Sequence, residues 1–334
     1  MAQTLDGDLA PAAVLSRFGL LAEDGWQAQH LRTMNNSVFS IGRSVEEPAW
    51  ALRRHRADWR DADAIGAELA LLEYLDEQLP DPFSVPRPGR SRDGDYLVTL
   101  DGARYSLLGW IPGMPQRPHP VGGLDAESAW LLGRGLGSIH SVTDRWTRRT
   151  APMQWNARTL FTEAHPGLLG ADPAALRAIL PAADLELFDE VADRTSEVFD
   201  RVQDWGLIHA DYILGNCHWT TVEGRLSLGI LDFDDFGHGP RLFDLGAVLG
   251  NLADFPRTWA TLAPAFLAGY RTAHDLPENA EQELPLMMAA RHTSHCLWAL
   301  GHQDLGQEWI ITHLHDRMEL ARLCLAVSFD FRSV

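Results

Sequence analysis

One stretch of the sequence decides the fold, and it reads Ile208-His209-Ala210-Asp211-Tyr212-Ile213-Leu214-Gly215-Asn216. Directly after it the sequence predicts a β-hairpin, with strands over residues 217–221 and 225–233 and a turn at Val222-Glu223-Gly224. The second strand closes on Leu231-Asp232-Phe233-Asp234. The loop and the strand end therefore bring carboxylate and amide side chains to one hairpin, as a polar functional site requires.

The His-x-Asp-x₄-Asn spacing of this stretch, followed by a strand that ends in Asp-Phe-Asp, is typical of a kinase catalytic loop. Phosphoryl transfer needs a carboxylate beside the attacking hydroxyl, so Asp211 is the candidate catalytic residue. His209 is a second candidate, and we expect it to brace the loop by hydrogen bonding rather than to transfer a proton. Mg²⁺ prefers hard oxygen ligands, so Asn216, Asp232 and Asp234 are the candidate metal ligands. One such aspartate alone would suit an ordinary loop or a strand cap, but the ordered combination favours the kinase-like interpretation.

Three runs carry a family resemblance: residues 207–216, residues 229–235 and residues 241–246. They resemble the aminoglycoside phosphotransferase and choline kinase-like superfamily, and look closest to its branch with homoserine kinase of the second type. The resemblance implies a bilobal protein-kinase-like fold with ATP in the cleft, Asp211 as the catalytic residue, and Asn216 and Asp232 as Mg²⁺ ligands. It also implies that Asp244 ties its helix to the catalytic loop rather than touching substrate.

The rest of the chain predicts an α+β fold in two parts. The first part reads as an antiparallel sheet with one amphipathic helix, and the second is mostly helical. The expected elements are strands within 27–56, a helix over 62–79, strands over 96–100 and 104–110, and helices within 126–140, 173–203, 257–274 and 284–325. We expect a nucleotide-binding lobe over 1–110, a linker over 111–120, and a catalytic and acceptor-binding lobe over 121–334.

The nucleotide site is predicted in the first part. Arg53 ends a strand at the place where kinases carry a phosphate-binding lysine, and Glu68 lies on the apolar stripe of the following helix. A carboxylate at the edge of a buried stripe needs a partner, so we expect Arg53 and Glu68 to pair, the alternative being that Glu68 reaches solvent. The chain contains no lysine, and the planar guanidinium of arginine can also bind phosphate.

Two further segments are weaker nucleotide candidates. Asn36 and Ser37 lie where the family has its phosphate-covering turn, although the Gly-x-Gly-x-x-Gly pattern is missing and a simple hairpin turn explains them equally well. Leu108 and Trp110 lie in a stretch that resembles the strand-to-linker hinge whose backbone contacts adenine.

Composition and net charge exclude several classes of binding partner and site. A net charge of −18 argues against nucleic acid, and the absence of a signal-peptide pattern or a long apolar run predicts a cytoplasmic protein without a membrane span. The three cysteines suggest neither a disulfide framework nor a zinc site. The oligomeric state is left open.

The sequence indicates only the chemical class of the molecule that accepts the phosphoryl group. The short segment 237–240 replaces the activation loop of protein kinases, which favours a small-molecule hydroxyl over a protein. A closed pocket with an arginine for a carboxylate would favour a hydroxy amino acid, and a wide acidic cleft would favour an aminoglycoside-type antibiotic. Because arginine replaces lysine at position 53, a nucleotide-binding pseudokinase or a protein-directed stress kinase stays as the alternative of another class.

The C-terminal helices are rich in histidine and tryptophan. No metal-ligand pattern is formed by the histidines at positions 292, 295, 302, 313 and 315. The region where the family binds its acceptor contains Trp298 and Trp309, with Asp304 and Glu308 nearby.

Overall fold

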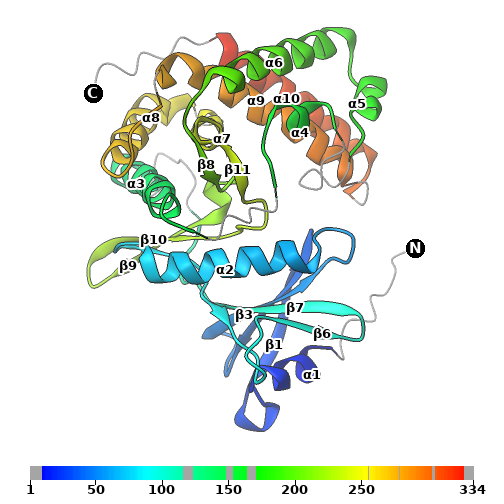
Figure 1. Cartoon of the computed structure of the whole chain (residues 1–334), viewed down its shortest axis with the longest axis vertical. Coiled ribbons are helices and arrows are strands. Elements are labelled where there is room, and N and C mark those ends of the chain that lie inside the picture. Colours follow the sequence, from blue (N-terminus) through cyan, green and yellow to red (C-terminus); the bar gives the residue numbers. More distant parts are fainter. Residues whose placement is uncertain are drawn as a thin grey trace. The chain divides into compact units, whose positions relative to one another are not determined.

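The computed structural model describes residues 10–115, 123–147, 153–163, 171–254, 256–277, 279–302 and 305–326. The chain divides into two compact units, of which the first comprises Met1–Glu77 with Ser84–Pro112 and the second comprises Gln78–Phe83 with Gly113–Val334. Figure 1 shows a sheet-rich first unit and a helix-rich second one. The predicted linker 111–120 lies outside the described residues from position 116 onward.

The first unit is built on an antiparallel sheet with the strand order β1-β2-β3-β7-β5, and β6 pairs with the first half of β7 along the edge opposite β3. Tight turns fix its hairpins: Asp101 and Gly102 both take positive φ, as a two-residue turn between β6 and β7 requires. Its elements are α1 (Ala10–Arg17), β1 (Gln27–Thr33), β2 (Asn36–Gly42), β3 (Pro48–His55), α2 (Ala62–Gln78), β5 (Pro88–Gly89), β6 (Leu97–Leu100) and β7 (Ala103–Gly109).

Successive side chains of a strand point to opposite faces of its sheet, so β3 contributes residues to the packing on both faces. Leu52 packs into a core with Val14 and Leu15 of α1, while its neighbour Arg53 pairs with Glu68 of α2. The two helices therefore lie on opposite faces of the sheet, as Figure 1 also shows. The predicted helix over 62–79 and the strands around it are confirmed to within a residue or two.

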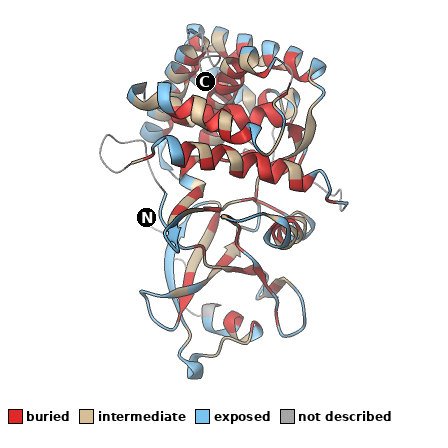
Figure 2. Cartoon of the chain, turned by 90° about the vertical axis from the view of Figure 1, so that its left-hand side faces the viewer, coloured by how far each residue is buried: buried red, intermediate tan, exposed pale blue. Residues whose placement is uncertain are grey.

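The second unit is mostly helical, and Figure 2 shows that its helices bury the sides that face one another. Helices α3 and α8 touch backbone to backbone: a Cβ at Gly133 would lie 1.8 Å from the carbonyl oxygen of Phe266, and one at Gly269 would lie 1.9 Å from that of Trp130. The described helices are α3 (Ala126–Thr143), α4 (Ala157–Phe161), α5 (Pro173–Ile179), α6 (Ala182–Arg201), α7 (Arg241–Ala253), α8 (Pro256–Arg271), α9 (Ala280–Gly301) and α10 (Gln307–Ala326).

Two small sheets hold the functional loop. The predicted hairpin is present as β9 (Cys217–Val222) and β10 (Arg225–Ile230), with β4 (Phe83–Ser84) beside β10 and positive φ at Glu223 and Gly224. A second pair, β8 (Trp205–Ile208) with β11 (Gly237–Pro240), was not predicted. Strand β11 reads Gly-His-Gly-Pro, a composition that disfavours strands, so tertiary packing decides its pairing with β8. A Cβ at Gly237 would lie 2.7 Å from the carbonyl oxygen of Met153.

The expected α+β fold class, with an antiparallel N-terminal sheet and a mostly helical C-terminal part, is confirmed. Among the boundaries that differ, the hairpin strand expected to run to 233 ends at Ile230, and the last helical stretch, expected from 284, begins with α9 at Ala280. In the described part of the chain, no helix combines the length and the apolarity needed to cross a membrane.

Buried histidines make stability depend on pH. Burial, with Arg53 and Arg104 nearby, lowers the pKa of His55 to about 2, so the folded chain leaves this ring neutral. The unfolded chain protonates it below about pH 6.5, and the free energy of unfolding should fall by about 1.4 kcal/mol per pH unit below that value for this one group. Denaturant unfolding should show a shallower loss on acidification in His55→Gln than in wild type. The exposed His315→Gln is the matched control, and equal slopes in all three proteins would contradict the assignment.

Candidate active site

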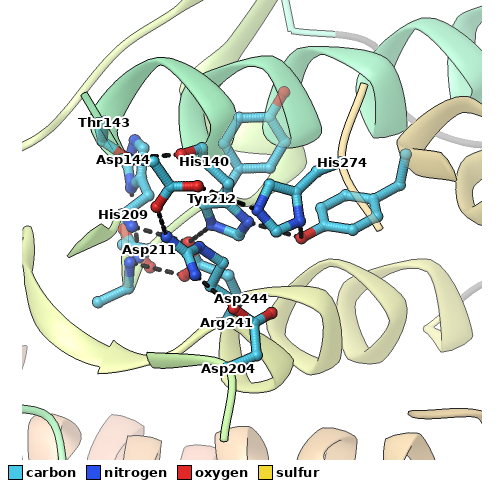
Figure 3. Close-up of polar contacts among 12 residues, drawn as sticks. His140, Thr143, Asp144, Asp204, His209, Asp211, Tyr212, Arg241, Asp244 and His274 are labelled. Atoms are coloured by element: carbon cyan, nitrogen blue, oxygen red, sulfur yellow. Dashed lines mark hydrogen bonds and ion pairs between the residues drawn. The ribbon is translucent and has the colours of Figure 1, made fainter. Parts of the chain in front are cut away.

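The loop that carries Asp211 is clamped by one buried carboxylate (Figure 3). Asp244, in the first turn of α7, is fully buried and accepts the backbone N–H of His209 on Oδ2 and that of Ala210 on Oδ1, each at 2.7 Å. Ala210 has φ of 65°, a costly conformation for a residue with a side chain, and the clamp holds it there. The predicted tie between Asp244 and the catalytic loop is therefore present.

The Asp244 carboxylate has a third partner that sequence analysis missed. His140 of α3 lies 3.2 Å from Asp244 Oδ2 through Nε2 and 2.8 Å from the Tyr270 hydroxyl through Nδ1. Burial lowers the pKa of His140 and raises that of Tyr270, so both are neutral. A carboxylate only accepts, so Nε2–H of His140 donates to it, and Nδ1 accepts from the tyrosine hydroxyl. Three donors thus compensate one buried charge.

The start of α7 is tied down by Arg241. Its buried guanidinium forms ion pairs with Asp144, at the end of α3, and with Asp204, just before β8. Gly206 leaves room for it, since a Cβ there would lie 2.0 Å from an Arg241 terminal nitrogen. The helix that positions Asp244 is therefore anchored to the segments that flank the loop.

Asp211 keeps 23% of its side chain exposed and is oriented from two sides. The amide nitrogen Nδ2 of Asn216 donates to Asp211 Oδ2 at 2.8 Å and to its backbone oxygen at 3.0 Å. Arg291 of α9 forms an ion pair with Asp211 Oδ1 and donates to the carbonyl oxygen of Ala210 at 3.3 Å. Sequence analysis did not identify Arg291, because it lies in a helical stretch about 80 residues from the loop, where nothing distinguishes it from other arginines.

His209 has the contacts of a brace. Its Nε2 lies 3.0 Å from the carbonyl oxygen of Leu231, and its Nδ1 accepts the backbone N–H of Asp211 at 3.3 Å. Its ring also packs on Phe233 with a centroid separation of 4.4 Å. Both ring nitrogens are therefore engaged in joining the loop to the end of β10.

The candidate metal ligands flank the hairpin: Asn216 directly precedes β9, and Asp232 and Asp234 follow β10. Leu231 N–H donates to the Asn216 carbonyl oxygen at 2.8 Å, which joins the end of the loop to the residue before Asp232. Asp232 has φ of 66°, and Asp234 is buried. Because Asn216 gives its amide nitrogen to Asp211, its Oδ1 is the atom suited to a cation. Among the described residues, no three His, Cys, Asp or Glu side chains gather as a metal cage. Mg²⁺ in nucleotide enzymes is held by one or two carboxylates plus phosphates, so this oxygen donor set fits it.

In the first unit, the predicted pair is present: Arg53 donates to Glu68 at 2.5 Å, with 7% and 4% of the side chains exposed. The other candidates serve the sheet. Asn36 Oδ1 accepts the backbone N–H of Arg56 at 3.3 Å, and Ser37 accepts the Thr33 hydroxyl at 3.0 Å. Leu108 is buried, and Trp110 N–H donates to the carbonyl oxygen of Ala49 at 3.0 Å.

The C-terminal histidines and tryptophans form a contact cluster between α9 and α10. His295 Nδ1 lies 2.9 Å from His313 Nε2, and Trp309 stacks on His313 with a centroid separation of 4.7 Å. Trp298 lies 4.4 Å from His295 and 6.2 Å from Trp309 between ring centroids. These rings contact one another, as expected of structural or pocket-lining residues. Asp304 lies outside the described residues.

Comparisons with known proteins agree with this geometry. The model of the phosphotransferase enzyme family matches residues 31–282. The chain is 28% identical over 264 residues to a homoserine kinase of Granulibacter bethesdensis, which covers 74% of this chain and 75% of that protein.

Two solved structures are similar over most of the chain. One is a microcompartment-associated aminopropanol kinase, with a TM-score of 0.71 and 22% identity over 95% of each chain. The other is an amicoumacin kinase in complex with AMP-PNP and Ca²⁺, with a TM-score of 0.70 and 19% identity over 92% of this chain and 91% of that one. Likeness at these identities establishes the fold, and it confirms the predicted protein-kinase-like fold class.

Loss of the Asp244 carboxylate should unfold the loop it clamps. Asp244→Ala leaves the N–H groups of His209 and Ala210 buried without an acceptor, so we expect the free energy of unfolding to fall by about 3–5 kcal/mol. Denaturant unfolding measures this loss. The exposed Asp193→Ala on α6 is the control and should stay within about 0.5 kcal/mol of wild type. A loss below about 1 kcal/mol in Asp244→Ala would show that the clamp is dispensable.

Proposed function

The chain belongs to the phosphotransferase enzyme family, as its resemblance predicted, and from this premise we propose that it transfers the γ-phosphoryl group of ATP to a small-molecule hydroxyl. The proposed acceptor is an amino alcohol, a hydroxy amino acid or a similar metabolite. One observation carries the proposal: Asp211 is a partly exposed carboxylate held on a loop whose backbone is clamped by a fully buried one, Asp244.

In the proposed reaction the acceptor hydroxyl oxygen bonds to the γ-phosphorus while the bond from that phosphorus to the bridging oxygen breaks, and ADP leaves. The hydroxyl proton passes to the carboxylate of Asp211 and then to solvent. A base must come within hydrogen-bond reach of its proton, and the exposed part of Asp211 permits this. Catalysis comes mainly from positioning, which Asn216 and the Asp244 clamp supply to the Asp211 side chain and backbone.

Asn216, Asp232 and Asp234 are the residues proposed to hold Mg²⁺. When bound, Mg²⁺ supplies charge neutralisation on the β- and γ-phosphates. Asn216 has a double duty in this proposal, since its amide nitrogen orients Asp211 and its amide oxygen is left for the cation. The Ca²⁺ and AMP-PNP complex of the amicoumacin kinase neighbour supports a divalent cation and an adenine nucleotide as cofactors.

Arg53 is proposed to bind the nucleotide phosphates, with Glu68 holding its guanidinium. A buried arginine needs a carboxylate to compensate its charge, and the 2.5 Å contact supplies one. Asn36 and Ser37, at the start of β2, are proposed as further nucleotide contacts, and Leu108 and Trp110 as part of the hinge whose backbone contacts adenine.

A metabolite acceptor is supported by the similar proteins, since a homoserine kinase and an aminopropanol kinase are among them. An antibiotic acceptor of the aminoglycoside type would require acidic side chains around Asp211. Arg291 brings a cation there instead, which favours an acceptor with a carboxylate, such as a hydroxy amino acid. A pseudokinase is the rival of another class, and the intact set Asp211, Asn216 and Asp232 argues for activity.

The direct test is Mg²⁺-dependent ADP release from ATP across a panel of amino alcohols, hydroxy amino acids, sugars and aminoglycosides. We expect at least one acceptor to stimulate release, and Asp211→Asn to lower that rate by about 100-fold or more, since a positioned base contributes about 10²–10⁴-fold. Tight ATP binding without stimulation by any acceptor would favour the pseudokinase. Stimulation that survives in Asp211→Asn would remove Asp211 from the reaction.

A paired substitution separates the nucleotide role of Arg53 from its structural role. Arg53→Met leaves Glu68 buried without a cation and should lower the free energy of unfolding by about 3–5 kcal/mol. The double variant Arg53→Met, Glu68→Leu removes both charges and should recover most of that stability, while its KM for ATP stays about tenfold or more above wild type. The adjacent Arg54→Met is the matched control. An unchanged KM for ATP in the double variant would limit Arg53 to a structural role.

A further inference from the structure

The guanidinium of Arg291 lies at the place that an acceptor must approach. It pairs with the carboxylate of Asp211 and donates to the carbonyl oxygen of Ala210 at 3.3 Å. A hydroxyl that gives its proton to Asp211 must come within about 3 Å of that carboxylate. The atoms attached to this hydroxyl therefore come within a few bond lengths of Arg291.

The loop does not need Arg291 to hold its shape. Asp244 fixes the backbone of His209 and Ala210, and Asn216 fixes both the side chain and the backbone oxygen of Asp211. Arg291 is therefore an additional partner on a carboxylate that is already oriented. A guanidinium has five N–H donors, and its two hydrogen bonds here use two of them. The remaining donors can bind a second carboxylate bidentately.

Among the described residues, Arg291 is the cation that pairs with Asp211. Burial, with Arg317 and Arg291 nearby, lowers the pKa of His292 to about 3, and burial lowers the pKa of His313 to about 4. The same cause holds the pKa of His295 well below its usual value. These rings are neutral near pH 7. Arg317 of α10 is engaged with His292, at 3.3 Å from its Nδ1, and within the described residues it has no ion pair with Asp211.

We propose that Arg291 is the specificity-determining residue for the acceptor and that it binds a carboxylate carried by the same molecule as the reacting hydroxyl. The proposal rests on the phosphotransferase function above and names its substrate class, a hydroxy acid such as a hydroxy amino acid. The acceptor carboxylate takes over N–H donors of Arg291, so the guanidinium bridges it and Asp211. An acceptor with an amine and no carboxylate gains nothing from Arg291 and is repelled by its charge.

Matched acceptor pairs test this inference, because each amino acid differs from its amine partner only by the carboxylate. The pairs are homoserine with 3-amino-1-propanol, serine with ethanolamine, and threonine with 1-amino-2-propanol. We expect kcat/KM to favour the carboxylate member of the best pair by about 100-fold in wild type. Arg291→Gln should abolish most of this preference by lowering kcat/KM for the amino acid about 100-fold more than kcat/KM for its amine partner. Arg291→Lys should restore part of it, and Arg194→Gln on the exposed face of α6 should match wild type.

Binding measured separately keeps this inference distinct from the phosphotransferase proposal. Calorimetric titration of each pair into the AMP-PNP complex reads the carboxylate preference without turnover. In one outcome, wild type prefers the carboxylate member in binding and Arg291→Gln removes that preference, while no acceptor stimulates ADP release. This outcome would support the inference and contradict the phosphotransferase function. Equal losses for both members of a pair in Arg291→Gln would show that Arg291 only positions Asp211. A wild type that binds the amine as well as the amino acid would overturn the inference.

Discussion

The loop that carries Asp211 depends on the buried carboxylate of Asp244. Two backbone N–H groups and the imidazole of His140 converge on it, and without them a charge inside the protein would be strongly unfavourable. The bonds act in both directions, because they also hold Ala210 in a left-handed conformation that turns the chain toward Asp211. The position of Asp211, the proposed catalytic residue, is thus determined by a second carboxylate that is fully buried.

The helix that carries Asp244 is itself anchored by ion pairs. Helix α7 begins at Arg241, whose ion pairs with Asp144 and Asp204 join the end of α3 to the segment before β8. Each partner comes from a different part of the sequence, so the loop takes its shape only when the helical unit is assembled. The rigidity needed for phosphoryl transfer is therefore a property of the helical unit and not of the loop alone.

Arginine takes every cationic role in this lysine-free chain. Arg53 is buried against Glu68, and Arg291 lies against Asp211. A guanidinium stays charged when buried and offers several donors in one plane, so one side chain can hold a protein carboxylate and still bind an anionic group of a ligand. The same chemistry underlies the roles proposed for both residues, one toward nucleotide phosphates and the other toward an acceptor.

The sequence by itself determined the features that depend on neighbours along the chain. Turn residues such as Glu223-Gly224 and the apolar spacing of α2 predict local structure, and the spacing of Asp211 and Asn216 specifies one loop. The pairing of Arg53 with Glu68 was also predictable, since a carboxylate on a buried stripe must find a cation. Only the tertiary structure decided which residues distant in the sequence contact the loop. The Gly-His-Gly-Pro strand has no local preference for pairing, and Arg291 and His140 reach the loop because helix packing brings them there, which no local pattern encodes.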